Sequence, residues 1–288
     1  MAAPLSLKKG LLLMVQITGM TRLIAHIGWP TEPFKAPLIY NPWFEKAGID
    51  AVVVPMGATA QDYPEFFKYV FRLSNILGAL VTMPHKRTTA SLVDRQSRAV
   101  AIAGACNAVR LGVDGKLEGD LFDGYGFVSA MMRAGEKIKN SSALIVGAGG
   151  VGSAIAGALA EHDVGQLGLY DVVPGLSEQL RDRLHIHFKN LEIKTGSNDP
   201  KGYDFIVNAT PIGLAAGDPI SVDVSRISPT AFVGEVVMSD TPLLAAAKAR
   251  GCRIQSGLSM NYEQISAYLN FFGLPSTDPE TLQRIARV

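Results

Sequence analysis

The sequence has few of the residues that build disulfide frameworks or metal sites. Its two cysteines, Cys106 and Cys252, lie too far apart for a disulfide framework or a zinc knuckle, which fits a reducing compartment. Its five histidines form no metal-ligand spacing such as H-E-x-x-H. We therefore expect no metal site, a cytoplasmic location and two cysteines that act as small buried residues.

Charged residues and long apolar runs are also scarce. Charged residues make up 18% of the chain and the net charge is +1, so neither a nucleic-acid-binding surface nor a charged tail is expected. No segment reaches the roughly 20 apolar residues that a membrane span needs. The apolar run after Lys8-Lys9 loosely resembles a signal peptide, but it is short and lacks a clean cleavage site. We expect a disordered or strand-like leader there.

A glycine-rich turn occupies the middle of the sequence. The apolar residues 142–146 lead into Gly147-Ala148-Gly149-Gly150-Val151-Gly152, and a helix of small residues is expected over 153–160. In this G-x-G-x-x-G pattern the first glycine permits a tight turn, the second lets the backbone approach a pyrophosphate, and the third lets the helix pack on the strand. The helix N-terminus then attracts the diphosphate. The context predicts a dinucleotide-binding unit.

An acidic residue after the next strand predicts which dinucleotide is bound. Asp171 follows the expected strand at 166–170 and lies 24 residues after Gly147, close to the usual spacing of about 20. A carboxylate there accepts hydrogen bonds from the adenosine ribose hydroxyls and repels the 2′-phosphate of NADP. No arginine follows it directly. We therefore expect NAD as the cofactor, with NADP less favoured.

Apolar runs alternate with helical patterns along the chain. Strands are expected at 23–28, 49–55, 78–82, 203–207 and 231–237, and helices at 37–47, 62–73, 127–134 and 261–272. Such alternation predicts an α/β protein with mostly parallel sheets. Thr241-Pro242 predicts the start of another helix. Residues 123–126 are expected to form a flexible junction between two domains.

Two charged residues near these strands suggest redox chemistry. Lys86 follows the strand at 78–82, at the edge where α/β proteins bind ligands, and Asp123 lies on the junction. Hydride transfer to a carbonyl leaves an alkoxide that a lysine ammonium can protonate, while an aspartate orients the lysine. Taken alone, these residues are more simply a surface lysine and a surface aspartate, and Asn107 is a turn residue.

Five ordered motifs give the sequence a resemblance to the shikimate/quinate dehydrogenase family, from about residue 23 to residue 288. They are residues 80–86 (family pattern N-V-T-x-P-x-K), 104–107 (G-A-x-N), 119–124 (G-D-N-x-D-G), 208–213 (N-A-T-x-x-G) and 257–264 (G-x-x-M-x-x-x-Q). The resemblance implies reversible oxidation of a hydroxyl on a cyclohexene or cyclohexane carboxylic acid with a nicotinamide cofactor. It also implies a substrate domain of residues 1–124, a Rossmann-type domain of residues 125–256, and a C-terminal segment, 257–288, whose helix returns to the first domain.

The resemblance assigns roles residue by residue. Lys86 and Asp123 become the catalytic pair. The substrate positions are Thr82, Asn107, Gln264, Phe34, Ala36 and Leu80. The cofactor positions are Gly147, Ala148, Gly149, Gly150, Val151, Gly152, Asp171, Asn208, Ala209, Thr210, Met238 and Gly257.

The sequence departs from the family at the substrate carboxylate. The usual S-x-S-P is Phe34-Lys35-Ala36-Pro37, the asparagine of N-V-T is Leu80, and a usual tyrosine is Met238. Each lost hydrogen bond is worth about 0.5–1.5 kcal/mol, or about 1.5–3 kcal/mol when its partner is charged. We expect weak shikimate turnover, or a substrate with a more apolar or differently placed substituent. Lys35 is a candidate replacement charge only if its side chain faces the pocket.

Other interpretations stay open. A non-catalytic NAD-binding sensor with a drifted substrate pocket accounts for the apolar substitutions, and a catabolic quinate enzyme accounts for Asp171. The ligand is expected to be a small cyclic hydroxy acid or polyol, with no nucleic-acid or membrane partner. The sequence leaves open whether the protein is a monomer or a homodimer.

Overall fold

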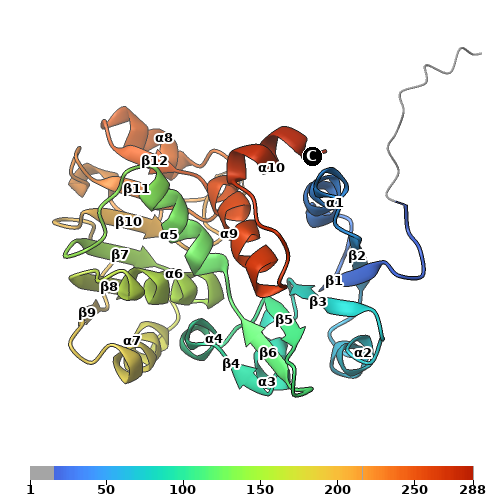
Figure 1. Cartoon of the computed structure of the whole chain (residues 1–288). Coiled ribbons are helices and arrows are strands. Elements are labelled where there is room, and N and C mark those ends of the chain that lie inside the picture. Colours follow the sequence, from blue (N-terminus) through green and yellow to red (C-terminus); the bar gives the residue numbers. More distant parts are fainter. Residues whose placement is uncertain (1–15, 216, 288) are drawn as a thin grey trace, which may run out of the picture.

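The chain forms two six-stranded sheets separated by helices (Figure 1). The computed structural model describes residues 16–215 and 217–287, so the predicted leader lies largely outside the described residues. Within these ranges, no helix combines the length and apolarity needed to cross a membrane. Cys106 and Cys252 are both buried free thiols, as predicted.

The first sheet has the order β2-β1-β3-β5-β6-β4. Its strands are β1 (Arg22–Gly28), β2 (Ala51–Gly57), β3 (Ile76–Val81), β4 (Arg95–Gln96), β5 (Ala108–Leu111) and β6 (Leu117–Asp120). The β2-β1-β3 half is parallel, as the alternating pattern predicted. The β5–β6 hairpin, whose strand β5 pairs antiparallel with β3, was not predicted because its strands are only four residues long.

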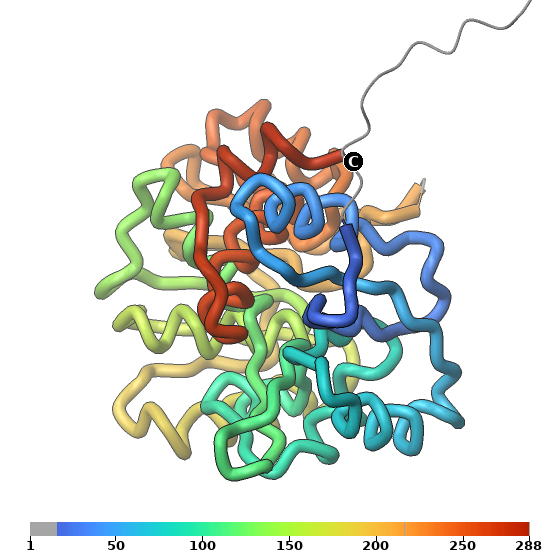
Figure 2. The backbone as a smooth tube through the Cα atoms, turned by 45° about the vertical axis from the view of Figure 1, so that its right-hand side comes forward, coloured from blue at the N-terminus to red at the C-terminus, as the bar shows by residue number. Residues whose placement is uncertain are grey.

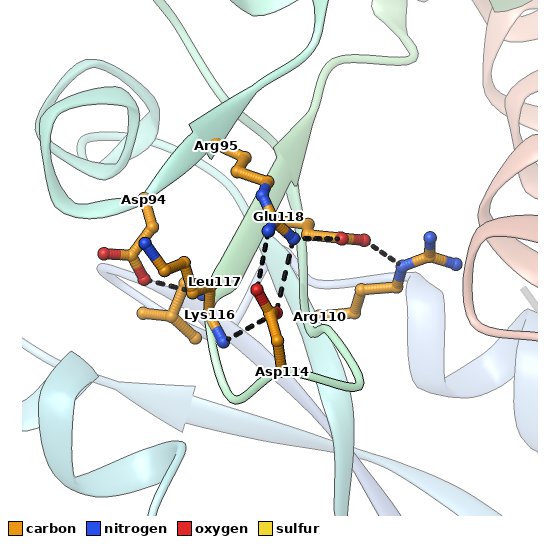
Figure 3. A network of polar contacts seen from close by, with 7 residues as sticks. All are labelled: Asp94, Arg95, Arg110, Asp114, Lys116, Leu117 and Glu118. Carbon is orange, nitrogen blue, oxygen red and sulfur yellow. Dashed lines mark hydrogen bonds and ion pairs between the residues drawn. The ribbon is translucent and has the colours of Figure 1, made fainter.

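Charged side chains hold the outer edge of this hairpin (Figure 3). Arg95 of β4 contacts Asp114 at 2.6 Å and Glu118 at 3.2 Å, and Glu118 also accepts a hydrogen bond from Arg110 at 2.9 Å. The Asp94 carboxylate accepts a hydrogen bond from the backbone N–H of Leu117. Arg95 and Asp114 are exposed, so solvent screens these pairs and they add little to stability.

The second sheet is parallel throughout and has the order β12-β11-β10-β7-β8-β9. Its strands are β7 (Ser142–Val146), β8 (Gln166–Tyr170), β9 (Glu192–Thr195), β10 (Phe205–Asn208), β11 (Phe232–Glu235) and β12 (Arg253–Gln255). In sequence order this is the 3-2-1-4-5-6 arrangement of a Rossmann fold. The order in which successive strands are added to the sheet reverses between β7 and β10, where such folds bind their ligands.

Helices cover both sheets and fill the space between them (Figure 1). They are α1 (Ala36–Ala47), α2 (Tyr63–Val70), α3 (Lys86–Leu92), α4 (Arg98–Ala103), α5 (Asp123–Arg133), α6 (Gly150–Glu161), α7 (Leu176–His187), α8 (Pro242–Ala249), α9 (Gly257–Phe271) and α10 (Pro279–Ile285). As predicted, α8 begins after Thr241, whose Oγ1 accepts a hydrogen bond from the N–H of Leu244 at 3.2 Å.

The flexible junction predicted at residues 123–126 is wrong, because α5 begins at Asp123. Its glycines allow close packing between helices rather than flexibility. A methyl group added at Gly124 would overlap the carbonyl oxygen of Ala154 in α6, and one added at Gly126 would overlap that of Met260 in α9. The backbone of α5 therefore touches both neighbouring helices, which fixes the direction of the side chains in its first turn.

The C-terminal segment returns to the first sheet, as predicted. Tyr262, Ile265 and Leu269 of α9 are buried in one core with Ile24 of β1. Figure 2 shows this segment beside α1, and the N–H of Arg287 donates to the carbonyl of Leu38 at 2.9 Å. The helix α9 thus lies between the two sheets and contacts both halves of the molecule.

Candidate active site

Lys86 and Asp123 meet at the centre of the molecule. Lys86 Nζ lies 2.6 Å from Asp123 Oδ2, and the Asp123 side chain is 6% exposed while that of Lys86 is 23% exposed. Each residue is the first of its helix, α3 and α5. The carboxylate accepts a hydrogen bond from Nζ and so holds the lysine side chain in one direction. The fold thus brings together two residues that lie 37 positions apart in the sequence, and the lysine end of the pair is open to solvent.

An aromatic pair anchors the helix that carries Lys86. The His85 ring stacks on Tyr63, with ring centroids 3.9 Å apart and planes 8° from parallel. His85 Nε2 donates to the carbonyl of Ala58 at 2.8 Å, since a carbonyl can only accept. The hydroxyls of Tyr63 and Thr89 are 2.7 Å apart, and Thr89 donates to the His85 carbonyl. These contacts hold the start of α3 in place, and two of their residues, Tyr63 and Thr89, were not predicted to have a role.

Two amide side chains near the pair each have one buried atom without a partner among the described residues. Asn107 is 1% exposed; its Oδ1 accepts the N–H of Phe122 at 3.0 Å, while its Nδ2 has no hydrogen-bond partner among the described residues. Gln264 donates to Asn261 Oδ1 at 3.0 Å, and its buried Oε1 is likewise unpartnered. Buried polar groups are almost always hydrogen-bonded. One free donor and one free acceptor therefore suit the hydroxyl groups of a bound ligand.

The wall near Thr82 is apolar. A methyl group added at Gly28 would lie 2.5 Å from the Thr82 methyl and 2.8 Å from Phe34 Cζ, so these two side chains adjoin. Leu80 is buried, Ala36 is half-buried at the start of α1, and Lys35 is exposed. Phe34, Ala36 and Leu80, the three positions predicted to have lost polar groups, thus bring no polar side chain to this wall. Lys35 points to solvent and supplies no replacement charge.

His26 is a further polar residue on this wall that the sequence analysis missed. It lies in β1, is 9% exposed, and stacks on Phe34 with ring centroids 4.1 Å apart. Its Nδ1 is buried without a partner among the described residues. Burial lowers the pKa of His26 to about 4, so the ring is neutral at pH 7. A polar residue within the apolar run 23–27 was the available signal.

Burial of His26 predicts sensitivity to acid. Its ordinary pKa is 6.5 and its folded pKa about 4, so between these values only the unfolded chain binds the proton. The free energy of unfolding is therefore highest above about pH 6.5, and protonation of His26 lowers it by about 2–3 kcal/mol as the pH approaches 4. Urea unfolding at about pH 7 and about pH 4.5 should therefore show a larger loss for the natural protein than for His26→Leu. Equal losses in the two proteins would contradict this prediction.

The glycine-rich turn is open where a diphosphate would approach. Gly147 has φ +103°, so its positive φ requires glycine, and a methyl group added at Gly152 would overlap the Gly147 carbonyl oxygen. Gly149, in contrast, is exposed, with no atom within 4 Å of an added Cβ. In the described part of the chain, no side chain caps the N-terminus of α6. The free N–H groups and the open space fit the pyrophosphate of a dinucleotide.

Asp171 ties this turn to β8. Its Oδ2 accepts the N–H of Ala148 at 2.7 Å and its Oδ1 accepts that of Val173 at 2.9 Å. A carboxylate has about four acceptor sites, so capacity remains for ribose hydroxyls. The other members of the predicted turn, Gly150 and Val151, form the first residues of α6.

A buried carboxylate organises the second predicted cofactor segment, 208–210. Glu235, fully buried at the end of β11, accepts hydrogen bonds from Asn208 Nδ2 at 2.8 Å and Thr241 Oγ1 at 3.1 Å. Burial raises the pKa of Glu235. Asn208 Oδ1 accepts the Thr210 hydroxyl at 2.7 Å, so both side chains are engaged within the turn. The backbone of Ala209 adjoins Gly147 and so lies beside the glycine-rich turn.

The two remaining predicted positions lie at the junction of β11 and α9. Met238 is 62% exposed, and the N–H of Gly257 donates to the carbonyl of Val237 at 3.0 Å. A side chain at Gly257 would overlap the Val236 carbonyl. The glycine thus lets α9 start directly against the second sheet.

Sequence reasoning did not single out Glu235, although an acidic residue inside the apolar run 231–237 was a signal.

Comparisons with known proteins identify relatives of this chain. A family model described as the shikimate dehydrogenase substrate binding domain matches residues 27–109, and a model of the ThiF family matches residues 126–172. A shikimate dehydrogenase (NADP(+)) of Rubrobacter xylanophilus is 33% identical over 272 residues, which cover 92% of this chain and 94% of that protein.

Solved structures show the same fold. Shikimate 5-dehydrogenase from Listeria monocytogenes, in complex with shikimate and NAD, has a TM-score of 0.85 at 24% identity, covering 94% of this chain and 98% of that chain. Quinate dehydrogenase from Corynebacterium glutamicum, in complex with NAD, has a TM-score of 0.81 at 27% identity, covering 92% and 98%.

Proposed function

Because the chain belongs to the shikimate dehydrogenase family, we propose that it oxidises a ring hydroxyl of shikimate or of a related cyclic hydroxy acid or polyol, reversibly. The observation that carries the proposal is the Lys86–Asp123 contact at 2.6 Å beside the unpartnered Nδ2 of Asn107. In this proposal residues 1–124 and 257–288 bind the substrate, and residues 125–256 bind the cofactor.

The residues divide the chemistry between them. When bound, the nicotinamide ring accepts or returns the hydride. In the oxidising direction the Lys86 amine takes the proton of the reacting hydroxyl as the hydride leaves the carbon that bears this hydroxyl. In the reducing direction the Lys86 ammonium returns the proton to the oxygen. Asp123 accepts a hydrogen bond from Nζ and orients it. Asn107 and Gln264 hold neighbouring hydroxyls, which fixes the reacting carbon toward the cofactor.

Asp171 supports NAD as the preferred cofactor, although the relative from Rubrobacter xylanophilus carries NADP(+) in its name. We expect kcat/KM to favour NAD because the Asp171 carboxylate repels a 2′-phosphate. Asp171→Asn keeps the size of the side chain and removes its charge. This variant should lower the NAD/NADP ratio of kcat/KM by about tenfold, chiefly through the KM for NAD. A natural protein that prefers NADP would contradict the assignment.

The apolar wall formed by Phe34, Ala36 and Leu80 supports weak turnover of shikimate itself. It also supports the second candidate, a non-catalytic sensor that binds the cofactor. The deciding experiment is NADH or NADPH formation by the purified protein with shikimate, quinate and their neutral analogues, each with NAD and NADP. Turnover of any of these substrates excludes the sensor. Cofactor binding by calorimetry without any turnover favours it and contradicts the proposed function.

A further inference from the structure

The strongest unexplained feature of the substrate wall is His26. Its Nδ1 is buried with no hydrogen-bond partner among the described residues, an arrangement that folding disfavours. The position is fixed, because His26 pairs with Leu80 of β3 and with Pro55 of β2 in parallel register. An atom of this kind, held on a rigid strand, is suited to a ligand rather than to the core.

The neighbours of His26 place it in the substrate pocket. Leu80, its partner on β3, and Phe34, which stacks on its ring at 4.1 Å, both stand where the family resemblance predicts polar substrate contacts. The Phe34 ring also adjoins the Thr82 methyl across Gly28. The imidazole, the phenyl ring and Thr82 therefore form one continuous surface, and the segment after Thr82 leads to Lys86.

The charges around this surface do not suit a carboxylate. His26 is neutral at pH 7, Lys35 is exposed, and the Lys86 ammonium is already paired with Asp123. A carboxylate placed here would lose water without gaining a cation or a serine hydroxyl. A neutral group loses less on burial, and a neutral imidazole offers one donor and one acceptor to it.

We propose that His26 is a substrate-binding residue, whose Nδ1 makes a hydrogen bond to a neutral polar substituent of the ring after the Phe34 ring turns aside. This inference rests on the proposed function and narrows it. The substrate is a cyclic polyol that bears an amide, carbonyl or hydroxyl group where shikimate bears its carboxylate.

The test compares shikimate with its carboxamide in three variants. Asn places a polar atom near the position of Nδ1, Gln places one nearer to Nε2, and Leu removes both. With the natural protein, kcat/KM for the carboxamide should exceed that for shikimate by about tenfold or more. His26→Leu should lose about tenfold on the carboxamide, while His26→Asn should stay within about threefold of the natural protein. Far-UV circular dichroism and thermal melting confirm that each variant is folded.

Two results would overturn the inference: a preference for shikimate over the carboxamide, or an unchanged kcat/KM for the carboxamide in His26→Leu. If the Leu variant does not fold, the Asn and Gln variants decide, and equal activity of the two would also overturn it. Calorimetry of carboxamide binding in the presence of NAD separates this inference from the proposed function. Binding that depends on His26 without oxidation would support the subsite while the proposed reaction fails.

Discussion

Replacing Lys86 with methionine is expected to lower kcat by about 10²–10⁴-fold, because the variant keeps the length of the side chain but cannot carry the proton. The cofactor contacts predicted for the glycine-rich turn lie elsewhere, so the Kd for NAD should stay within about threefold of its original value. Single-turnover kinetics with an active substrate, together with calorimetry of NAD binding, separate the two effects.

A matched control for this variant exists on the surface. Lys35→Met removes an ammonium from an exposed position in the substrate half of the protein and should leave kcat unchanged. Lys86→Met also leaves the buried Asp123 carboxylate without its cation, so a fall in Tm accompanies the loss of activity. The activity assay is therefore run well below the Tm of the variant. A kcat within about threefold of the natural protein would rule out proton transfer by Lys86.

Much of the fold could be predicted from the sequence because the strongest signals in the sequence are local. The glycine pattern at 147–152, with strands on either side, specifies a strand, a tight turn and a helix within thirty residues, and β7, α6 and β8 follow it closely. The C-terminal helix was predictable from its amphipathic pattern and from the family resemblance. The β5–β6 hairpin and the start of α5 were not, because each depends on tertiary contacts: pairing with β3, and the approach of Gly124 to α6.

The candidate site was predictable only where motifs marked it. The resemblance named Lys86 and Asp123, but it could not say that their side chains meet, since α3, β4, α4, β5 and β6 lie between them in the chain. It also could not find His26 or Glu235, because their significance lies in burial. Each is one polar residue in an apolar strand, and only packing decides whether such a residue lacks a partner, as His26 Nδ1 does, or finds several, as Glu235 does.

Two substitutions that each add one methyl group to the glycine-rich turn are expected to have different effects. One should lower the stability of the fold, and the other should weaken cofactor binding. Gly152→Ala places a methyl group against the carbonyl oxygen of Gly147. Packed neighbours hold the backbone of both residues in place. Relief requires α6 to move away from β7, across a core that includes the fully buried Ile155 and Leu159. We expect a loss of about 3 kcal/mol in the free energy of unfolding, or a Tm lower by roughly 6–12 °C.

Gly149→Ala is the matched control, because it adds the same methyl group three residues earlier. Gly149 has φ −71° and ψ −169°, which any residue adopts, and no atom lies within 4 Å of the added carbon. The free energy of unfolding should stay within about 0.5 kcal/mol of its original value.

The methyl group fills the space through which the diphosphate approaches the N–H groups of α6, so the Kd for NAD should rise by about tenfold or more. Thermal melting and calorimetry of both variants separate the two glycines: one supports the fold, and the other leaves room for the cofactor. If Gly149→Ala bound NAD as tightly as the natural protein, the diphosphate would have to lie away from the N-terminus of α6.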